Sequence, residues 1–191
     1  MLKDLVLKNR SCRGYDKSRP VTRKELTEFV DLARICPAKA NHQALRYRIV
    51  TDEAETSAVQ KLTRWGMALP QLHLPYPGQE APAFIVLCLD TGIAKHPADY
   101  GVDVGIAAQT MALAAAEAGY ACLMIESFDK KGVAEVLNLQ PNQVPALCMA
   151  FGVSAETAVL EDVAKDGSTK YYRDAQGIHH VPKRRLEDVL L

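Results

Sequence analysis

The sequence predicts an α+β domain, in which helices cover a layer of strands. About four apolar, strand-like segments lie among four or five helical segments, without the regular alternation typical of a doubly wound parallel sheet. The stretch 98–120 is apolar around most of a helical circumference, so other elements must enclose it on several sides. No linker or repeat divides the chain. We therefore expect residues 1–191 to form a single domain.

The stretch 98–120 is the predicted central helix, about 30 Å long at roughly 1.5 Å per residue. Its polar residues Asp99, Asp103, Thr110 and Glu117 recur at helical spacing and lie on one narrow face. Small glycine and alanine side chains elsewhere leave room for another backbone to approach. We expect a core helix that also forms a dimer contact. The alternative is an ordinary core helix in a monomer.

The segments before residue 66 predict three helices and one strand. Thr22 and Glu25 form a capping box that opens the second helix, and Pro37 ends it. The polar segment after Pro37 has no periodicity and is expected to be a loop. The predicted elements are a short amphipathic helix at 2–9, a helix at 23–36, a strand at 46–51 and a helix at 53–65.

The segment 66–82 combines four prolines and two glycines with scattered apolar residues, which excludes a regular element. A loop of this length is uncommon unless it covers a site, so we predict a lid or pocket wall, with disorder as the alternative. The run 83–89 is continuously apolar and rich in β-formers. It predicts a strand buried on both faces, leading into the central helix.

The remaining elements follow Gly119, which is placed as the C-terminal cap of the central helix. Asp129 is positioned to cap a short helix that follows the turn 126–129. The segment 156–177 is polar and is expected to be irregular. The predicted elements are a strand at 121–125, a helix ending near residue 139 and a strand at 146–153.

The composition favours small-molecule partners. The 23 basic and 23 acidic residues balance, so no overall field favours nucleic acid or an acidic membrane surface. The five cysteines contain no Cys-x-x-Cys pair, which argues against a zinc or dithiol site, and we expect no metal. The free thiols, and the absence of a signal sequence or a membrane-length apolar run, predict a cytoplasmic protein.

Two basic clusters at opposite ends of the chain call for an explanation. They are Arg10-Ser11-Cys12-Arg13 and 183–185 (Lys-Arg-Arg). Arginine forks beside a hydroxyl suit a phosphate monoester, whose oxygens accept several charge-assisted hydrogen bonds. The alternative is two solvated surface patches, because spacing alone cannot bring the clusters together.

The chain resembles the nitroreductase family of flavin mononucleotide (FMN) enzymes. Five segments carry the resemblance in the right order: NRSCRGYD, CPAKANHQ, DVGIAAQTMALAAAEAGY, LMIESFD and VPKRRLEDVL. The resemblance implies a homodimer in which each subunit has an antiparallel-rich sheet flanked by helices. It further implies long central helices at the interface, with FMN bound between the subunits.

The resemblance also implies which residues contact the flavin. Arg13 matches the basic residue that approaches N1 and the C2 carbonyl, where a cation stabilises the reduced ring. Glu126 and Ser127 match the turn whose backbone N–H points at N5. The phosphate contacts are Arg10, Ser11, Lys183 and Arg185, and the loop that meets the partner's flavin contributes Pro37, Ala38, Lys39 and Asn41.

The expected function is that of an FMN-dependent oxidoreductase. Hydride from NADH or NADPH passes to flavin N5, and electrons then pass to a nitroaromatic, quinone or similar acceptor. No side chain needs to act as acid or base. The alternatives are another flavin reaction on the same fold, such as dehalogenation, flavin destruction or desaturation, and a flavin-binding sensor or carrier without turnover. Asn9, Ala38 and Lys39 depart from common family residues, which leaves the acceptor open.

Overall fold

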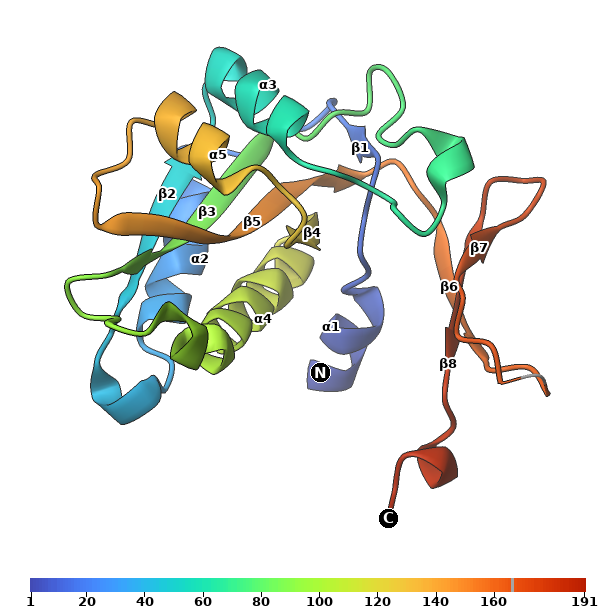
Figure 1. Cartoon of the computed structure of the whole chain (residues 1–191). Helices are drawn as coiled ribbons and strands as arrows, with labels where there is room; N and C mark the ends of the chain where they lie inside the picture. Colours follow the sequence, from blue (N-terminus) through green and yellow to red (C-terminus); the bar gives the residue numbers. More distant parts are fainter. Residues whose placement is uncertain (166) are drawn as a thin grey trace.

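The structure, a computed structural model, describes residues 1–165 and 167–191 and is built around an antiparallel sheet (Figure 1). Four of its strands run in the order β1-β5-β3-β2, and β4 also pairs with β5. All of these pairings are antiparallel. The strands are β1 (Tyr15–Asp16), β2 (Leu45–Val50), β3 (Ala83–Asp90), β4 (Ala121–Ile125) and β5 (Gln143–Ser154).

Helices cover both faces of this sheet, and the α+β prediction is confirmed. α2 and α4 lie on one face, and α3 and α5 lie on the other (Figure 1). The short α1 packs beside α4. The helices are α1 (Leu2–Lys8), α2 (Arg23–Arg34), α3 (Glu53–Leu62), α4 (Gly101–Glu117) and α5 (Lys130–Val136).

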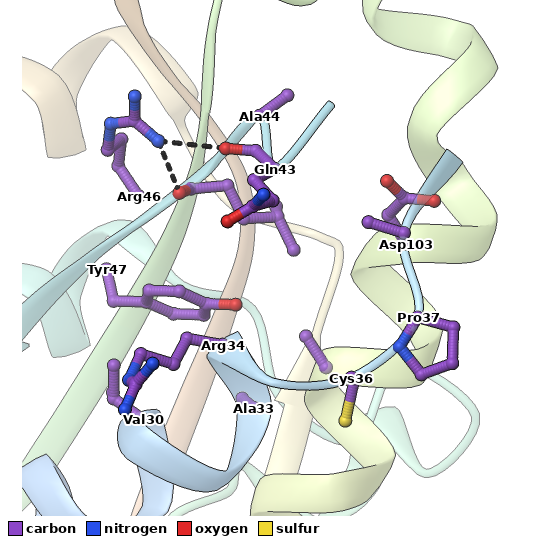
Figure 2. A pocket seen from close by; sticks show the side chains of 13 residues that line it. Val30, Ala33, Arg34, Cys36, Pro37, Gln43, Ala44, Arg46, Tyr47 and Asp103 are labelled. Atoms are coloured by element: carbon purple, nitrogen blue, oxygen red, sulfur yellow. Dashed lines mark hydrogen bonds between the residues drawn. The ribbon is translucent and has the colours of Figure 1, made fainter. Parts of the chain in front are cut away.

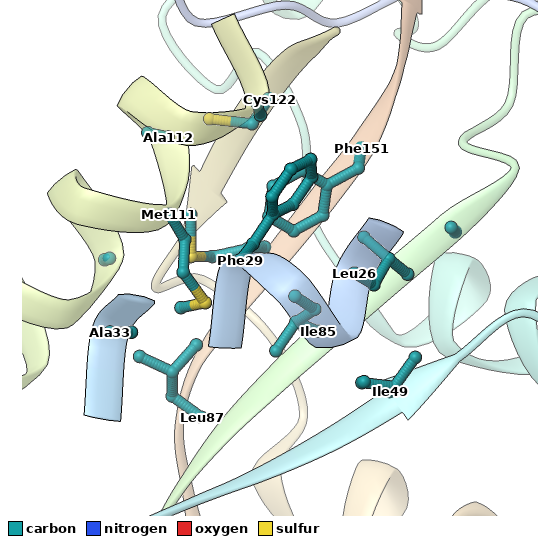
Figure 3. Packing of buried hydrophobic residues seen from close by; sticks show 14 of the residues in the cluster. Leu26, Phe29, Ala33, Ile49, Ile85, Leu87, Met111, Ala112, Cys122 and Phe151 are labelled. Atoms are coloured by element: carbon teal, nitrogen blue, oxygen red, sulfur yellow. The ribbon is translucent and has the colours of Figure 1, made fainter. Parts of the chain in front are cut away.

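β3 joins the two layers of the core because its side chains alternate between the faces of the sheet. Ile85 and Leu87 pack with the α2–α4 side, where Phe29 meets Phe151 at a ring distance of 5.9 Å (Figure 3). Val86 belongs to the cluster on the other side. The prediction of a strand buried on both faces is therefore confirmed.

The capping predictions are also confirmed. The Thr22 hydroxyl accepts from the backbone N–H of Glu25, and the Glu25 carboxylate accepts from that of Thr22 at 2.9 Å. Asp129 accepts from the Gly132 N–H at the start of α5. Gly119 follows the end of α4 with φ +83°, a conformation that glycine adopts readily.

The central helix is shorter than predicted. Residues Pro97–Tyr100 form a 3-10 turn, and α4 covers Gly101–Glu117. Its polar face points at the loop that follows α2. The Asp103 carboxylate accepts from the backbone N–H of Lys39, and the Thr110 hydroxyl lies 3.2 Å from the Cys36 sulfur. Asp99, Asp103 and Thr110 of the narrow polar stripe thus contact the segment after α2, whereas Glu117 is exposed.

α3 also ends earlier than predicted, at Leu62 rather than near Trp65. Thr63 forms an isolated antiparallel bridge with Phe128, and the Arg64 N–H donates to the Ser127 carbonyl at 2.9 Å. These contacts draw the chain away from the helix axis. As a result, Trp65 lies outside the helix and beside the turn after β4.

The prediction of irregular structure at 156–177 is wrong for two segments, which form strands. β6 (Ala158–Asp162) pairs in parallel with β8 (His179–Lys183), and β7 (Tyr172–Arg173) pairs antiparallel with β8. This second sheet projects from the end of β5, away from the central sheet (Figure 1). Its edge strands are short and largely exposed, so they lack the apolar pattern that identifies a buried strand.

None of the helices within the described residues has both the length and the apolar character needed to cross a bilayer.

Candidate functional site

The two basic clusters meet in one cavity of about 460 Å³. Arg10 follows α1, Ser11 bridges to Cys122 of β4, and Lys183 ends β8, so three elements bring these side chains to the same place. Spacing in the sequence could not bring the two clusters together. In the fold, β8 pairs with β6, and Lys183 lies in the same cavity as Arg10 and Ser11. The alternative of two separate surface patches does not hold for Arg10, Ser11 and Lys183.

Only some of the hydrogen-bond donors of the Arg10 guanidinium have partners in this cavity. One terminal nitrogen donates to the Val6 carbonyl at 2.7 Å, whereas Nε is buried and has no partner within the described residues. Burial lowers the pKa of this guanidinium, because desolvation disfavours the charged form. A partly buried cation with a free donor beside a hydroxyl and a lysine is suited to an anion such as a phosphate.

Arg13 lies where this cavity adjoins a second one of about 520 Å³. The two cavities share Arg13, Met124 and Tyr171 as lining residues, and we call them together the Arg13 cleft. The Arg13 guanidinium carbon lies 4.9 Å from the centre of the Tyr171 ring, and a terminal nitrogen lies 3.5 Å from His179 Nε2. The cleft therefore carries fixed positive charge at its middle.

The second cavity has a wall of small residues. Gly101 and Gly105 of α4 face it, and a Cβ added at either would meet no atom within 4 Å. Glu126 and Ser127, directly after β4, line the same cavity, together with Trp65 and Gly66. A flat, extended group could lie against the exposed backbone of this wall. The cleft thus suits a ligand that is planar at one end and anionic at the other.

The loop after α2 lines a different cavity, of about 320 Å³ (Figure 2). Pro37 and Ala38 contribute to it, together with Asp103 and Tyr47. Asp103 and the residues of α4 that line the Arg13 cleft belong to different faces of that helix. Lys39 forms an ion pair with Asp99 at 2.8 Å. None of the four loop residues lines the Arg13 cleft of its own chain; they are Pro37, Ala38, Lys39 and Asn41.

Arg185 also lies outside both cavities of the Arg13 cleft. Its guanidinium is 3.6 Å from Asp162 and 4.0 Å from Glu187, and its side chain is more than half exposed. Of the eleven flavin contacts implied by the sequence, the structure brings together Arg10, Ser11, Arg13, Glu126, Ser127 and Lys183. It does not bring Pro37, Ala38, Lys39, Asn41 and Arg185 into that group.

Several residues of the cleft could not be predicted from the sequence. Tyr171 and His179 contact Arg13, and Glu156 accepts a hydrogen bond of 2.7 Å from the Arg13 backbone N–H. Burial, with the nearby Arg13 charge, lowers the pKa of His179. These residues lie in polar segments without periodicity, so only the long-range folding of the second sheet reveals them. Trp65 also lines the cleft, and its being the single tryptophan of the chain was a weak indication of such a role.

The cysteines near the cleft are buried thiols. Burial raises the pKa of Cys12 to about 11 and that of Cys122 to about 12. Cys12 donates to the Gly14 carbonyl at 3.0 Å. A thiolate is the reactive form of cysteine, and these environments disfavour it. Both residues therefore act as packing groups.

Comparison with known proteins identifies relatives of the chain. The sequence model described as the nitroreductase family matches residues 6–153. A Bacillus subtilis protein named as an NAD(P)H nitroreductase, YdgI, is 21% identical over 184 residues, which cover 80% of this chain and 88% of that protein. An Archaeoglobus fulgidus protein named as an NADH dehydrogenase or NAD(P)H nitroreductase is 24% identical over 153 residues, covering 78% of this chain and 82% of the relative.

Solved structures share the fold. A Staphylococcus epidermidis protein named as an NAD(P)H:FMN oxidoreductase has a TM-score of 0.71 at 16% identity, covering 100% of this chain and 95% of its own. A nitroreductase from Exiguobacterium sibiricum, solved in complex with FMN, has a TM-score of 0.67 at 16% identity, covering 82% and 89%. The first of these matches includes the region of the second sheet, which the family model does not reach.

Proposed function

Because the chain belongs to the nitroreductase family, we propose that it is an FMN-dependent oxidoreductase. It takes hydride from NADH or NADPH and passes electrons to a nitroaromatic, a quinone or a similar acceptor. The names of its relatives and the FMN-bound neighbour support this activity.

The Arg13 cleft is the proposed FMN site. The observation that carries this proposal is that one hydrogen-bond donor of the Arg10 guanidinium has no partner among the described residues. Its buried Nε has no partner within the part of the chain that the structure describes, and Lys183 and Ser11 line the same cavity. Together these groups would hold the phosphate. Arg185 would join them by exchanging its contact with Asp162 for the phosphate.

The ring end of FMN would lie in the second cavity. The flavin, when bound, supplies the redox chemistry by accepting and donating hydride at N5. The contribution of Arg13 is a fixed charge that favours the reduced, anionic ring. Glu126 and Ser127 would offer backbone N–H groups to N5, and the open wall at Gly105 would let the ring approach α4. No side chain is assigned as an acid or base.

The proposal includes a homodimer with FMN between the subunits. Pro37, Ala38, Lys39 and Asn41 lie outside the Arg13 cleft of their own chain, as expected if they meet the flavin of the partner. Large apolar side chains are exposed on the elements around this loop. Val102 at the start of α4 is 72% exposed and Ile35 at the end of α2 is 67% exposed. A second copy would cover such surfaces.

Steady-state turnover of the FMN-loaded protein tests the proposed function. We expect oxidation of NADH or NADPH that depends on added FMN and on an acceptor such as menadione or nitrofurazone. Double-reciprocal plots at several acceptor concentrations should be parallel, because donor and acceptor use the flavin in turn. A protein that holds FMN firmly but turns over neither dinucleotide with any acceptor of these classes would be a flavin carrier or sensor instead.

A further inference from the structure

Glu156 is a buried carboxylate that the proposed function does not use. It forms an ion pair with Arg173, and the two side chains are only 7% and 10% exposed. Its other oxygen accepts the 2.7 Å hydrogen bond from the Arg13 backbone N–H. Removing two charges from water offsets most of their attraction, so a buried ion pair contributes little net stability. Its position beside Arg13 suggests a different role.

The end of β5 fixes the backbone on both sides of Arg13. The Ala155 N–H donates to the Gly14 carbonyl at 2.9 Å. The Cys12 thiol lies 3.4 Å from the Ser154 hydroxyl, which also accepts from the Glu156 N–H at 3.1 Å. With the Glu156 contact, these bonds leave the Arg13 backbone little freedom to move.

Glu156 also acts on the Arg13 side chain indirectly, through its ion pair with Arg173 in the second sheet. Arg173 lies two residues after Tyr171, whose ring packs against the Arg13 guanidinium at 4.9 Å. Tyr171 also contacts His179, with ring centres 5.1 Å apart, and His179 Nε2 lies 3.5 Å from Arg13. Holding Arg173 in place therefore holds the aromatic surface on which the guanidinium rests.

We infer that Glu156 is a positioning residue for Arg13. It fixes the Arg13 backbone directly and, through Arg173 and Tyr171, fixes the direction of the guanidinium in the Arg13 cleft. The inference rests on the proposed function, in which Arg13 faces the flavin ring. Its consequence is that a group without contact to the flavin sets part of the flavin reduction potential.

The reduction potential of bound FMN in Glu156→Gln tests this inference. Glutamine keeps the shape of the side chain and removes the charge that holds Arg173. With FMN in excess, we expect the relative binding of the reduced flavin to fall threefold to tenfold, equivalent to a drop of about 15–30 mV for a two-electron couple. A matched control is Glu55→Gln, which breaks the partly exposed Arg48–Glu55 ion pair, whose residues do not line the cleft, and should leave the potential unchanged.

A double-mutant cycle with Arg13→Gln separates positioning from a direct field effect. If Glu156 acts through Arg13, then Glu156→Gln should cause no further drop once the Arg13 charge is gone. A rise in potential, which direct loss of a nearby negative charge would cause, an equal shift in both backgrounds, or an unchanged potential in a folded Glu156→Gln protein, would overturn the inference. If Glu156→Gln does not fold, Arg173→Lys keeps the charge and loses the planar fork, and the same cycle applies with the same expected outcome.

Failure of the proposed function gives a different result. A wild-type protein that binds no FMN contradicts the proposed function itself, before any variant is compared. A wild-type protein that binds FMN with a potential insensitive to Arg13→Gln overturns the placement of Arg13, and with it the role of Glu156.

Discussion

The backbone N–H of Lys39 donates to both carboxylate oxygens of Asp103, at 3.0 and 3.1 Å, and so fastens the loop after α2 to the central helix. The loop needs such a support. Ala40, Asn41 and Gln43 all have positive φ, between 46° and 56°, a region that side-chain-bearing residues rarely adopt. Asp103 is itself buried, so its carboxylate depends on this contact.

Replacing Asp103 by alanine should therefore destabilise the protein by about 1–3 kcal/mol, because the Lys39 N–H loses a charged acceptor. Urea denaturation measures the loss, and limited proteolysis should show faster cleavage at residues 38–43. Asp99→Ala is the matched control, since its ion pair with the Lys39 ammonium is about half exposed, is screened by water and should contribute much less stability. Equal losses in both variants would contradict the assigned role of Asp103.

Arg10→Ala should weaken FMN binding by about 1.5–3 kcal/mol, the range for a hydrogen bond to a charged group. That loss corresponds to roughly a tenfold to hundredfold rise in Kd. Quenching of flavin fluorescence on binding provides the measurement. Arg185→Ala is the comparison, and we expect a smaller effect because Arg185 must first leave Asp162. An Arg10→Ala protein with unchanged affinity would place the phosphate elsewhere.

The second sheet should lose stability as the pH rises. His180 lies 3.1 Å from the carboxylates of both Asp174 and Glu161, and stacks on Tyr172. Asp174 chiefly, and then Glu161, raise the pKa of His180 above its ordinary 6.5. A raised pKa in the folded state gives stability that is fully present below pH 6.5 and is lost as the pH passes through the folded-state pKa.

Thermal unfolding of wild type and His180→Asn at several pH values checks this. The melting temperature of wild type should exceed that of the variant most below pH 6.5, and the difference should shrink toward pH 9. A difference that stays constant across this range would mean that His180 contributes only packing.

We expect a dimer that resists dilution, because exposed apolar area is unfavourable in water by about 25 cal/mol per Å². Val102 and Ile35 supply part of the surface that a second copy would cover. Sedimentation velocity at micromolar concentration should show a dimer, and Val102→Glu should shift it toward monomer. A folded wild-type monomer under the same conditions would contradict this part of the proposal.

Much of the fold could be predicted from local patterns in the sequence. β3 appears as a continuous apolar run, Thr22 and Glu25 mark the start of α2, and Gly119 marks the end of α4. Each of these signals arises from forces between residues that are close in sequence or buried in one core. Such forces leave a pattern that can be recognised in the sequence.

The elements that were missed depend on distant partners. The end of α3 is set by contacts of Thr63 and Arg64 with the turn after β4, more than 60 residues away. β6 and β8 pair across an intervening polar stretch, and His180 is held by carboxylates rather than by an apolar face. For the same reason, the resemblance identified the charged residues of the cleft, whereas Tyr171 and Glu156 became evident only in the structure.

The central claim is that the Arg13 cleft binds FMN through its phosphate and ring, and the visible absorption spectrum of the protein tests it most directly. After incubation with excess FMN and removal of free ligand, we expect a yellow protein with flavin bands and about one FMN per chain, the stoichiometry of one cleft in each subunit. Riboflavin, which lacks the phosphate, should be retained far less well because Arg10, Ser11 and Lys183 would have no anion to bind. A protein that remains colourless after this treatment would contradict the account.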